Sequence, residues 1–232
     1  MKAQKNKKTF FFGFFNKRER WGLSWKGWLI SSFVTISFFM FVLKNLYSFL
    51  APTKRVDTKT LVVEGWLQDD DAMELAAKEF RDGKYDHIFV LGSPITKRKH
   101  FTKHQSTAEL GYETLLTMGI PAQNITPVTG PISLTNRTYH CALALKKYFA
   151  VKKIEISSLN LLSGGAHSRR SHLLFKLAFD NKLKIGIIAA ETAEIDNTHA
   201  WWSSSGGFRT VTSEFIAYLY SLFFKYAKLG SL

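Results

Sequence analysis

The sequence predicts an α/β protein with a Rossmann-like, mainly parallel sheet, helices on both of its faces and one transmembrane helix before it. From residue 60 onward, short apolar runs alternate with segments of helical periodicity. The apolar runs lack polar alternation, as expected for strands that are covered on both faces. An uncharged apolar segment at residues 28–43, WLISSFVTISFFMFVL, predicts the membrane helix.

The N-terminal tail, residues 1–26, is strongly basic. It carries eight Lys or Arg residues against Glu19 alone, in a chain of 232 residues with a formal net charge of +14. Because the tail adjoins an apolar segment, its expected partner is anionic lipid headgroups, and no nucleic acid partner is expected. The positive-inside rule places the N-terminus in the cytoplasm and the main domain outside it.

The predicted anchor covers residues 27–51, of which residues 27–50 form a helix long enough to span a bilayer core of roughly 30 Å. Trp25, Trp28 and Tyr47 lie near its two ends, as in an aromatic belt. The alternative is a cleaved signal peptide, but the apolar run is long for one and no clear small-x-small cleavage site follows. We expect a single-pass protein of the inner (plasma) membrane.

After a linker at residues 52–59, the α/β domain is predicted to occupy residues 60–232. Strands are expected at residues 60–65, 86–92, 124–128, 158–163 and 184–190. Helices are expected at residues 69–83, 106–118, 135–149, 167–179 and 212–226. Residues 93–105 are expected to form a basic loop, and residues 191–207 an irregular stretch.

The helix boundaries rest on local signals. Gly83 ends the first domain helix, and Ser106 with Glu109 forms a capping box for the second. The last helix contains FIAYLYSLFF at residues 215–224, which is short for a second membrane span. A core helix or a membrane-surface helix is expected there.

Candidate ligand-binding residues follow the predicted strands, because open α/β sheets bind ligands beyond the carboxyl ends of their strands. These ends carry Glu64 and Gly65, Gly92 and Ser93, Thr129 and Gly130, Ser163 to His167, and Glu191. A parallel sheet places all of them at one edge. A carboxylate that closes a buried run, as Glu64 does, is costly without a chemical task or a partner such as a nearby Lys.

The segment LNLLSGGAHSRRSHLLFKLAF, residues 159–179, is the strongest candidate for an anion site. Gly164 and Gly165 let the backbone approach a ligand, and the first turn of the following helix offers free N–H groups. Arg169 and Arg170 are expected to neutralise a phosphate or carboxylate. His167 or Glu64 is expected to transfer a proton. The alternative is a plain strand–loop–helix turn with a solvated basic face.

Other candidates have two interpretations each. Gly92 and Ser93 either approach the ligand or serve a turn. Glu109 either faces the same edge of the sheet or only completes the capping box. Thr138, which follows Asn136, either contacts substrate or only starts a helix. The basic loop at residues 97–104 either gates an anionic ligand or is simply solvated.

The sequence assigns no metal ligands and no particular cofactor. The consecutive Asp69, Asp70 and Asp71 are better explained by the helix dipole than by a metal ion. The single cysteine, Cys141, excludes an intramolecular disulfide and a cysteine-based metal site, and is expected to fill the core. P-loop, GxGxxG, GxSxG and HExxH motifs are absent from the sequence.

Several segments together are similar to a known family. In order they are LVVEGWL, YDHIFVLGSP, AELGYETLLTMGIP, NRTYHCALAL, LLSGGAHSRRSHLLFKLAF and IGIIAAE. Over residues 60–225 the chain resembles the SanA/ElyC/YdcF family of bacterial envelope proteins. The strand–Ser–small–His–x–x–Arg segment of that family is matched by Ser163, His167 and Arg170, and Glu64, Gly92 and Thr138 match its other positions.

The resemblance implies a Rossmann-like domain, often membrane-anchored, with links to envelope integrity and to peptidoglycan or polysaccharide metabolism. A soluble relative is associated with S-adenosylmethionine binding. No reaction is securely attached to the family.

Three functions are therefore open. The first is an envelope hydrolase or transferase, or a carrier-binding protein, whose ligand is a phosphorylated envelope or glycan precursor, either free or lipid-linked. The second is a nucleotide or S-adenosylmethionine binding domain in which Glu64 or Glu191 holds ribose hydroxyls. The third is a non-catalytic assembly factor with an exposed patch formed by Trp201, Trp202 and Phe208, which otherwise pack under the last helix.

Overall fold

The computed structural model describes residues 9–10, 15–16, 23–66, 70–96, 103–133, 135–191 and 198–229. The chain forms two compact units, Met1–Leu43 and Lys44–Leu232. The first unit contains the two-residue strands β1 (Thr9–Phe10) and β2 (Phe15–Asn16), which pair antiparallel. It also contains most of helix α1 (Trp25–Leu50), whose last turns belong to the second unit.

Helix α1 is the membrane-helix candidate. Among the described residues it is the one helix that is long and apolar enough to cross a membrane, by length and composition. It begins at Trp25, two residues before the predicted start, and ends at Leu50 as predicted. The side chains of Tyr47 and Leu50, near its end, are buried within the second unit.

The second unit is built on a five-stranded sheet in which all strands are parallel, which confirms the predicted fold class. Its strands are β3 (Thr60–Glu64), β4 (His87–Gly92), β5 (Ile125–Thr129), β6 (Ser158–Gly164) and β7 (Lys184–Ala190). Each lies within one residue of its predicted ends. The order β5–β4–β3–β6–β7 makes the chain run outward from β3 to β5 and then return to β6, on the other side of β3. This is a doubly wound arrangement.

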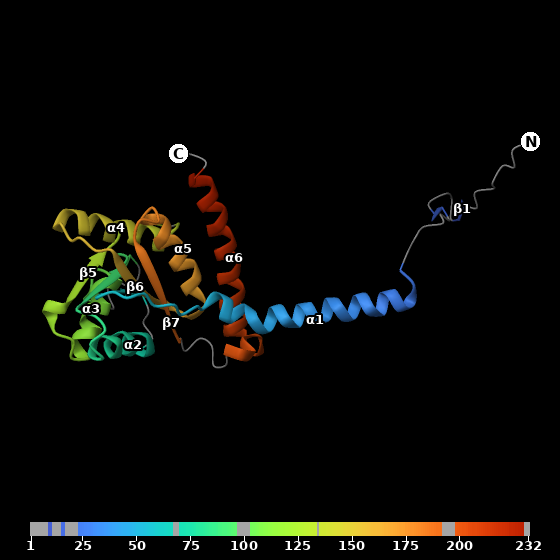
Figure 1. The fold of residues 1–232 in the computed structure, drawn as a ribbon, viewed down its shortest axis with the longest axis horizontal. Coiled ribbons are helices and arrows are strands. Elements are labelled where there is room, and N and C mark those ends of the chain that lie inside the picture. Colours follow the sequence, from blue (N-terminus) through green and yellow to red (C-terminus); the bar gives the residue numbers. More distant parts are fainter. Residues whose placement is uncertain are drawn as a thin grey trace, which may run out of the picture. The chain divides into compact units, whose positions relative to one another are not determined.

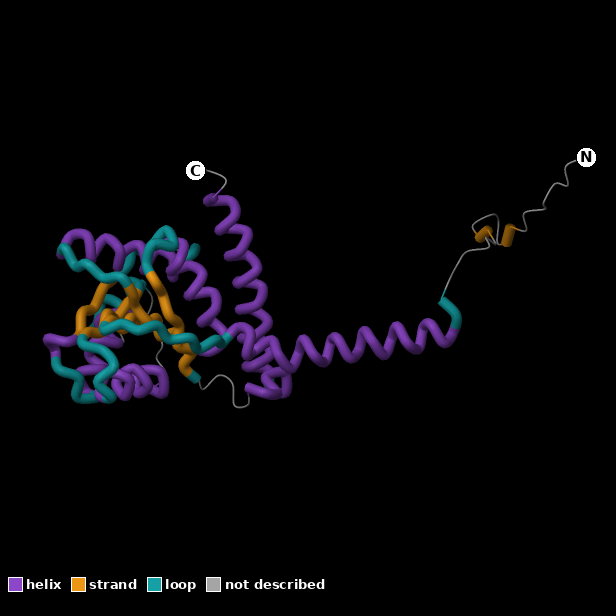
Figure 2. The backbone as a smooth tube through the Cα atoms, viewed as in Figure 1, coloured by secondary structure: helices purple, strands orange, loops and turns teal. Residues whose placement is uncertain are grey.

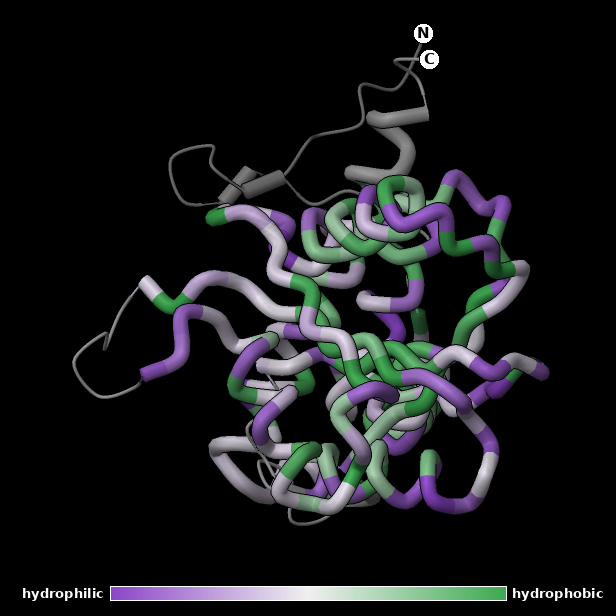
Figure 3. The backbone as a smooth tube through the Cα atoms, turned by 90° about the vertical axis from the view of Figure 1, so that its left-hand side faces the viewer, coloured by the Kyte–Doolittle hydropathy of each residue, from purple (hydrophilic) through white to green (hydrophobic). Residues whose placement is uncertain are grey.

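The helices and 3-10 turns of this unit are α2 (Asp70–Arg81), α3 (Thr107–Thr117), η2 (Ala122–Asn124), α4 (Arg137–Lys152), η3 (Gly165–His167), α5 (Ser168–Ala178), η4 (Thr198–Ser203) and α6 (Ser205–Leu229). Helices α4 and α5 cover one face of the sheet, and α2 and α3 cover the other (Figures 1 and 2). Successive side chains of one strand point to opposite faces of the sheet. In β3, Val62 packs with α4 and α5, whereas Leu61 and Val63 pack with α2 and α3. Figure 3 shows hydrophobic residues concentrated in the middle of the unit.

The last helix differs from its prediction. Helix α6 begins at Ser205 rather than at residue 212, and η4 occupies part of the stretch expected to be irregular. Gly207 does not break the helix. A Cβ at this position would overlap the carbonyl oxygen of Trp201, so the glycine permits a close approach. Trp201 is buried and stacks on Phe208 of α6, which is itself 53% exposed, so Trp201 does not contribute to the open patch considered for an assembly factor.

The predicted linker, residues 52–59, is attached to the sheet. The backbone of Lys54 pairs with that of Ile187 in β7, with N···O distances of 2.7 and 3.0 Å. The side chain of Asn160 in β6 bonds to both backbone groups of Val56, at 2.8 and 2.9 Å. The segment between α1 and β3 therefore has fixed partners in the α/β unit.

Candidate active site

The candidate site lies where the strand order reverses, between β3 and β6. Connections leave these neighbouring strands in opposite directions, which opens a crevice at their carboxyl ends. Val63 of β3 is in register with Leu162 of β6, so the next residues, Glu64 and Ser163, are neighbours. Ser163 donates a hydrogen bond from its Oγ to Oε2 of Glu64. The sheet itself therefore brings these two predicted site residues together.

Glu64 is a buried carboxylate, with 3% of its surface exposed. Besides Ser163, it accepts a bond from Ser171 of α5, whose Oγ lies 3.1 Å from each carboxylate oxygen. No Lys or Arg in the described segments bonds to it. Glu79, equally buried, shows the contrast, because Arg55 and Lys84 hold its Oε1 at 2.8 and 3.1 Å.

This contrast points to a chemical role for Glu64. Burying a carboxylate costs several kcal/mol unless opposite charge and hydrogen bonds offset the loss of water. Glu79 has both kinds of compensation, whereas Glu64 has hydroxyl donors and one titratable neighbour, His167, whose Nε2 lies 3.9 Å from Oε1. A buried carboxylate that faces a histidine is poised to exchange a proton with it.

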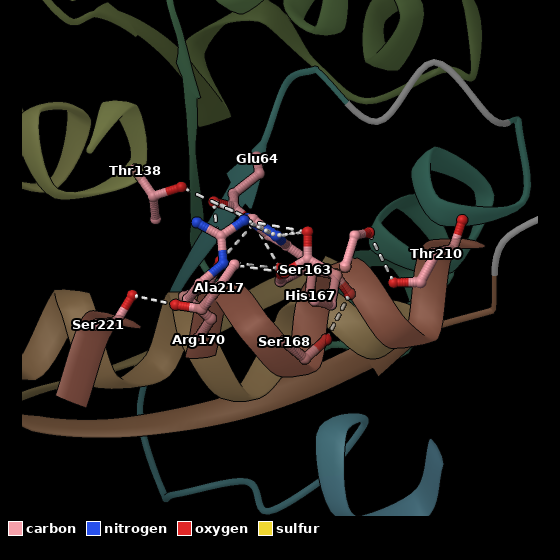
Figure 4. Close-up of polar contacts among 12 residues, drawn as sticks. Glu64, Thr138, Ser163, His167, Ser168, Arg170, Thr210, Ala217 and Ser221 are labelled. Carbon is pink, nitrogen blue, oxygen red and sulfur yellow. Dashed lines mark hydrogen bonds and ion pairs between the residues drawn. The ribbon is translucent and has the colours of Figure 1, made fainter. Parts of the chain in front are cut away.

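His167 connects two sets of partners. It ends η3 just before α5, and Figure 4 shows it beside Glu64, Thr138 and Arg170. Its Nε2 lies 3.4 Å from Thr138 Oγ1, on the same side as Glu64. The ring of Trp66 packs against the imidazole at 4.9 Å between centroids, at an interplanar angle of 85°. The imidazole is therefore held on several sides.

The other ring nitrogen of His167 faces a donor and an acceptor at once. Nδ1 lies 2.7 Å from Nη2 of Arg170 and 3.1 Å from Oε1 of Glu214. The guanidinium can only donate, so it supports an unprotonated Nδ1, whereas the carboxylate supports a protonated one. With Nδ1 protonated and paired with Glu214, Nε2 is the nitrogen that can take up and release a proton, on the side of Thr138 and Glu64.

Glu214, from α6, forms a paired contact with Arg170. Nε of Arg170 donates to Oε2 at 2.9 Å, and Nη2 donates to Oε1 at 3.0 Å. Burial alone raises the pKa of Glu214, but the hydrogen bonds and charges of His167 and Arg170 outweigh it and hold the pKa at about 2. Glu214 therefore stays ionised at neutral pH, and the charge of Arg170 is already compensated before any ligand binds.

A cavity of about 920 Å³ opens above these groups. Its polar or ionisable lining residues are Glu64, Trp66, Ser93, Thr96, Thr107, Ser133, Asn136, Arg137, Thr138, Cys141, His167, Arg170 and Glu214. Arg137 is exposed and has no hydrogen bond or ion pair with another described residue, so its charge is free for a ligand. Asn136 stands at the N-cap of α4 with a left-handed backbone (φ 49°), yet its side chain does not cap the helix.

Cys141 also lines the cavity but is a poor nucleophile. Burial raises the pKa of its thiol above the ordinary value, so the thiol stays protonated at neutral pH. Its Sγ lies 3.7 Å from Ser93 Oγ and 3.6 Å from the carbonyl oxygen of Gly92. The sequence interpretation of Cys141 as a core residue agrees with its burial.

The structure places five of the predicted site residues along the cavity, namely Glu64, Ser93, Thr138, His167 and Arg170. Ser163 lies behind Glu64 and is fully buried. Gly164 and Gly165 are also buried and do not line the cavity, so the predicted glycine cradle for an anion is not part of it. The chain passes directly from β6 through η3 into α5, which turns these glycines inward.

Two further predicted residues, Gly92 and Glu109, have other surroundings. Gly92 allows β4 to approach α3, because a Cβ there would overlap the backbone nitrogen of Ala108. Glu109 lies away from the cavity lining and serves the start of α3. Its backbone N donates to Ser106 Oγ at 3.2 Å, and its carboxylate accepts from the backbone N of Gln105 at 2.7 Å. In a capping box the carboxylate would accept from the backbone N of the N-cap residue, Ser106. Here it accepts from the backbone N of Gln105, one residue earlier.

Arg169 does not line the cavity. Its Nε donates to the carbonyl oxygen of Phe49 in α1, and its guanidinium lies 4.0 Å from the centroid of the Phe49 ring. Consecutive residues on a helix point about 100° apart, so Arg169 and Arg170 cannot both face the cavity.

Glu191, expected at the same edge of the sheet, does not line the main cavity either. Glu191 follows the edge strand β7 and lies in a separate surface depression with Asp71, Glu74 and Lys78. Two strand spacings of about 4.8 Å each separate β7 from β3, which is too far for one small site to include both carboxylates.

Sequence reasoning missed Glu214, Ser171 and Trp66. Glu214 comes from a helix that carries no recognisable motif, although it is the single acidic residue between Ser205 and Leu229. An isolated carboxylate in an otherwise apolar helix was the available signal. Ser171 stands one helical turn after His167, and this spacing places both on the same side of α5.

Neither metals nor known families identify the site further. Among the described residues, no group of three His, Cys, Asp or Glu side chains is arranged to hold a metal ion. Asp69 and residues 97–102 of the predicted basic loop lie outside the described residues.

No protein-family model and no curated protein matches the chain significantly. The fold and the geometry define a doubly wound α/β protein with a histidine–carboxylate site at the switch point.

Proposed function

We propose that this protein is a membrane-anchored envelope enzyme, a hydrolase or transferase that acts on a phosphorylated, lipid-linked glycan precursor. One observation carries the proposal: His167 lies between the Glu214–Arg170 pair and Glu64, at the wall of a cavity of about 920 Å³. A histidine whose Nδ1 is oriented by a carboxylate and whose Nε2 lies beside the cavity residues Thr138 and Glu64 has the arrangement of a general acid–base group.

In this proposal each residue has a distinct role. Arg137, the exposed cation of the cavity lining, binds the phosphate group, and the amide of Asn136 donates a further hydrogen bond. His167 takes a proton from the attacking water or alcohol as the new bond to phosphorus forms. The bond between phosphorus and the leaving oxygen then breaks, and His167 returns the proton to that oxygen. Glu64 stabilises the imidazolium between the two transfers.

The membrane setting of the proposal rests on α1. A helix that is apolar enough to cross a bilayer keeps the α/β unit near lipid-linked substrates. The basic tail argues for a cytoplasmic N-terminus and an α/β unit outside the cytoplasm. The resemblance to the SanA/ElyC/YdcF family supports the same envelope setting.

The two other functions have less support. Glu64 accepts bonds from two serine hydroxyls and is buried, so it is poorly placed to hold ribose hydroxyls. Glu191 is not part of the main cavity. A nucleotide or S-adenosylmethionine site therefore lacks the carboxylate that it was expected to use. The assembly-factor function lacks its three-residue aromatic patch, because Trp201 is buried.

The test uses the full chain in detergent micelles and separates the products by chromatography: lipid phosphate and inorganic phosphate from a long-chain isoprenyl pyrophosphate, and lipid phosphate and sugar phosphate, or a new phosphodiester, from a lipid-linked pyrophosphoryl sugar with an alcohol acceptor. We expect His167→Ala to lower the rate by about 10²–10⁴-fold, the usual contribution of a general acid–base group. The matched control is His140→Ala, since His140 lies on α4 outside the cavity lining. Unchanged turnover in His167→Ala, or no cleavage of a phosphorus–oxygen bond by the wild type in either substrate, contradicts the proposal.

A further inference from the structure

Helix α6 carries an apolar stripe on its outer surface. We define the outer stripe as Ile216, Leu219, Tyr220 and Phe223, which are exposed by 61%, 39%, 60% and 73%. Their spacing of three or four residues places them on one side of the helix. Of the large apolar side chains that are exposed after α1, α6 carries these four and Phe208, and the rest of the described chain carries Trp66, Ile132 and Val151.

The opposite side of α6 is fully occupied. Val211 and Ser221 are buried, and Glu214 reaches into the candidate site to hold Arg170 and His167. Helix α6 therefore has one side committed to the α/β unit and one apolar side without a partner in the described residues. Concentrated apolar surface of this kind marks a contact with protein or membrane.

The end of the membrane-helix candidate is fixed against the same helix. The ring of Phe49, near the end of α1, packs edge-on against Tyr218 of α6, with centroids 5.7 Å apart. Arg169 of α5 donates to the carbonyl oxygen of Phe49 and covers its ring. These residues all belong to the unit Lys44–Leu232. A bilayer crossed by α1 thus begins close to where α6 packs.

We propose that the outer stripe of α6 is a second membrane contact, inserted into the interfacial region of the bilayer that α1 spans. The apolar side chains suit the acyl boundary, and Tyr220 places a polar hydroxyl on an apolar ring, as is typical of that depth. Arg209 is exposed and lies seven residues before Ile216, on the same side of α6, where it meets anionic headgroups.

This docking has a consequence for the site that rests on the proposed function. Glu214 projects from the inner side of the same helix, so a docked α6 holds the cavity at the level of the headgroups. There the phosphate of a lipid-linked substrate reaches the cavity while its chain stays in the bilayer. The docking itself does not require that the site turns over any substrate.

The test uses the full chain with Cys141→Ala, reconstituted into vesicles that contain anionic lipid. A nitroxide is attached at Tyr220→Cys, at Ile216→Cys or, as the matched control, at Val151→Cys on α4, which is exposed by 68%. Collision rates are measured with oxygen, which concentrates in lipid, and with a water-soluble nickel chelate. We expect oxygen to dominate at Tyr220 and Ile216 and nickel to dominate at Val151.

Two results overturn the proposal. Nickel access at Tyr220 and Ile216 equal to that at Val151 shows that the stripe lies in water. Reduced access of both reagents shows that protein, and not lipid, covers the stripe. Because no substrate is involved, failure of this test is separate from failure of the proposed enzyme function.

Discussion

Glu64 and Glu191 both follow parallel strands of one sheet, yet their surroundings differ. Glu64 ends the central strand β3 and is buried, with bonds from Ser163 and Ser171. Glu191 follows the edge strand β7 and is exposed in a shallow depression beside Lys78. A strand end thus becomes a candidate site only where strands and helices surround it, which here means the point where the strand order reverses.

The largest effect is expected when each of the two carboxylates is replaced by its amide, because the two variants should then differ in activity. We expect Glu64→Gln to lower phosphate release by about 10²–10⁴-fold, because the amide cannot stabilise the imidazolium of His167. Glu191→Gln is expected to retain the wild-type rate. Equal rates for the two variants would break the distinction between the central and the edge position.

The second prediction concerns the pH dependence of stability that Glu214 of the central site contributes. The pKa of Glu214 is lowered from 4.5 to about 2, so its stabilising contribution is present above about pH 4.5 and is lost as the pH falls toward 2. We expect the stability difference between wild type and Glu214→Gln to shrink by about 3 kcal/mol over this range. Urea unfolding of the full chain in micelles, at several pH values, measures it.

The control is the same experiment with Glu214→Gln in the Arg170→Met background, in which the charge partner of Glu214 is absent, so we expect the pH-dependent difference to be smaller. If the difference between wild type and Glu214→Gln stays constant between pH 4.5 and 2, the pairing with Arg170 and His167 does not hold the Glu214 charge.

Single hydrogen bonds give the smallest expected effect. Ser171→Ala removes a donor from buried Glu64 and is expected to lower the free energy of unfolding by about 1–3 kcal/mol. Thr53→Val removes an acceptor for the backbone N of Ala189 on the exposed edge of β7, where water replaces it, so we expect a change within about 0.5 kcal/mol. If both variants lose the same free energy of unfolding in denaturant, burial does not determine how much each hydrogen bond contributes to stability.

Much of the fold was predictable because it depends on local patterns. Five unbroken apolar runs between helical segments gave every strand of the sheet to within one residue. The strand order was not predictable, since it depends on which strands pair over long separations. Helix α6 was predicted too short: it begins seven residues before the expected start, and Gly207 within it allows the close approach of Trp201, which no local pattern shows.

The site was partly predictable for the same reason. The strand-end rule found Glu64, Ser163 and His167, which the register of β3 and β6 brings together. The sequence could not separate Arg169 from Arg170, because the orientation of α5 on the sheet decides which of the two faces the cavity. It also could not place Glu214, whose partner Arg170 lies 44 residues away along the chain.

Both edges of the sheet are protected against the addition of a foreign strand. On β7, Lys54 already satisfies the N–H and the carbonyl of Ile187, so the free side of that strand is interrupted in its middle by a cation-bearing residue. On β5, Pro127 lacks an N–H and breaks the outer row of donors. These two interruptions therefore oppose edge-to-edge pairing between copies of the protein, even at high local concentration.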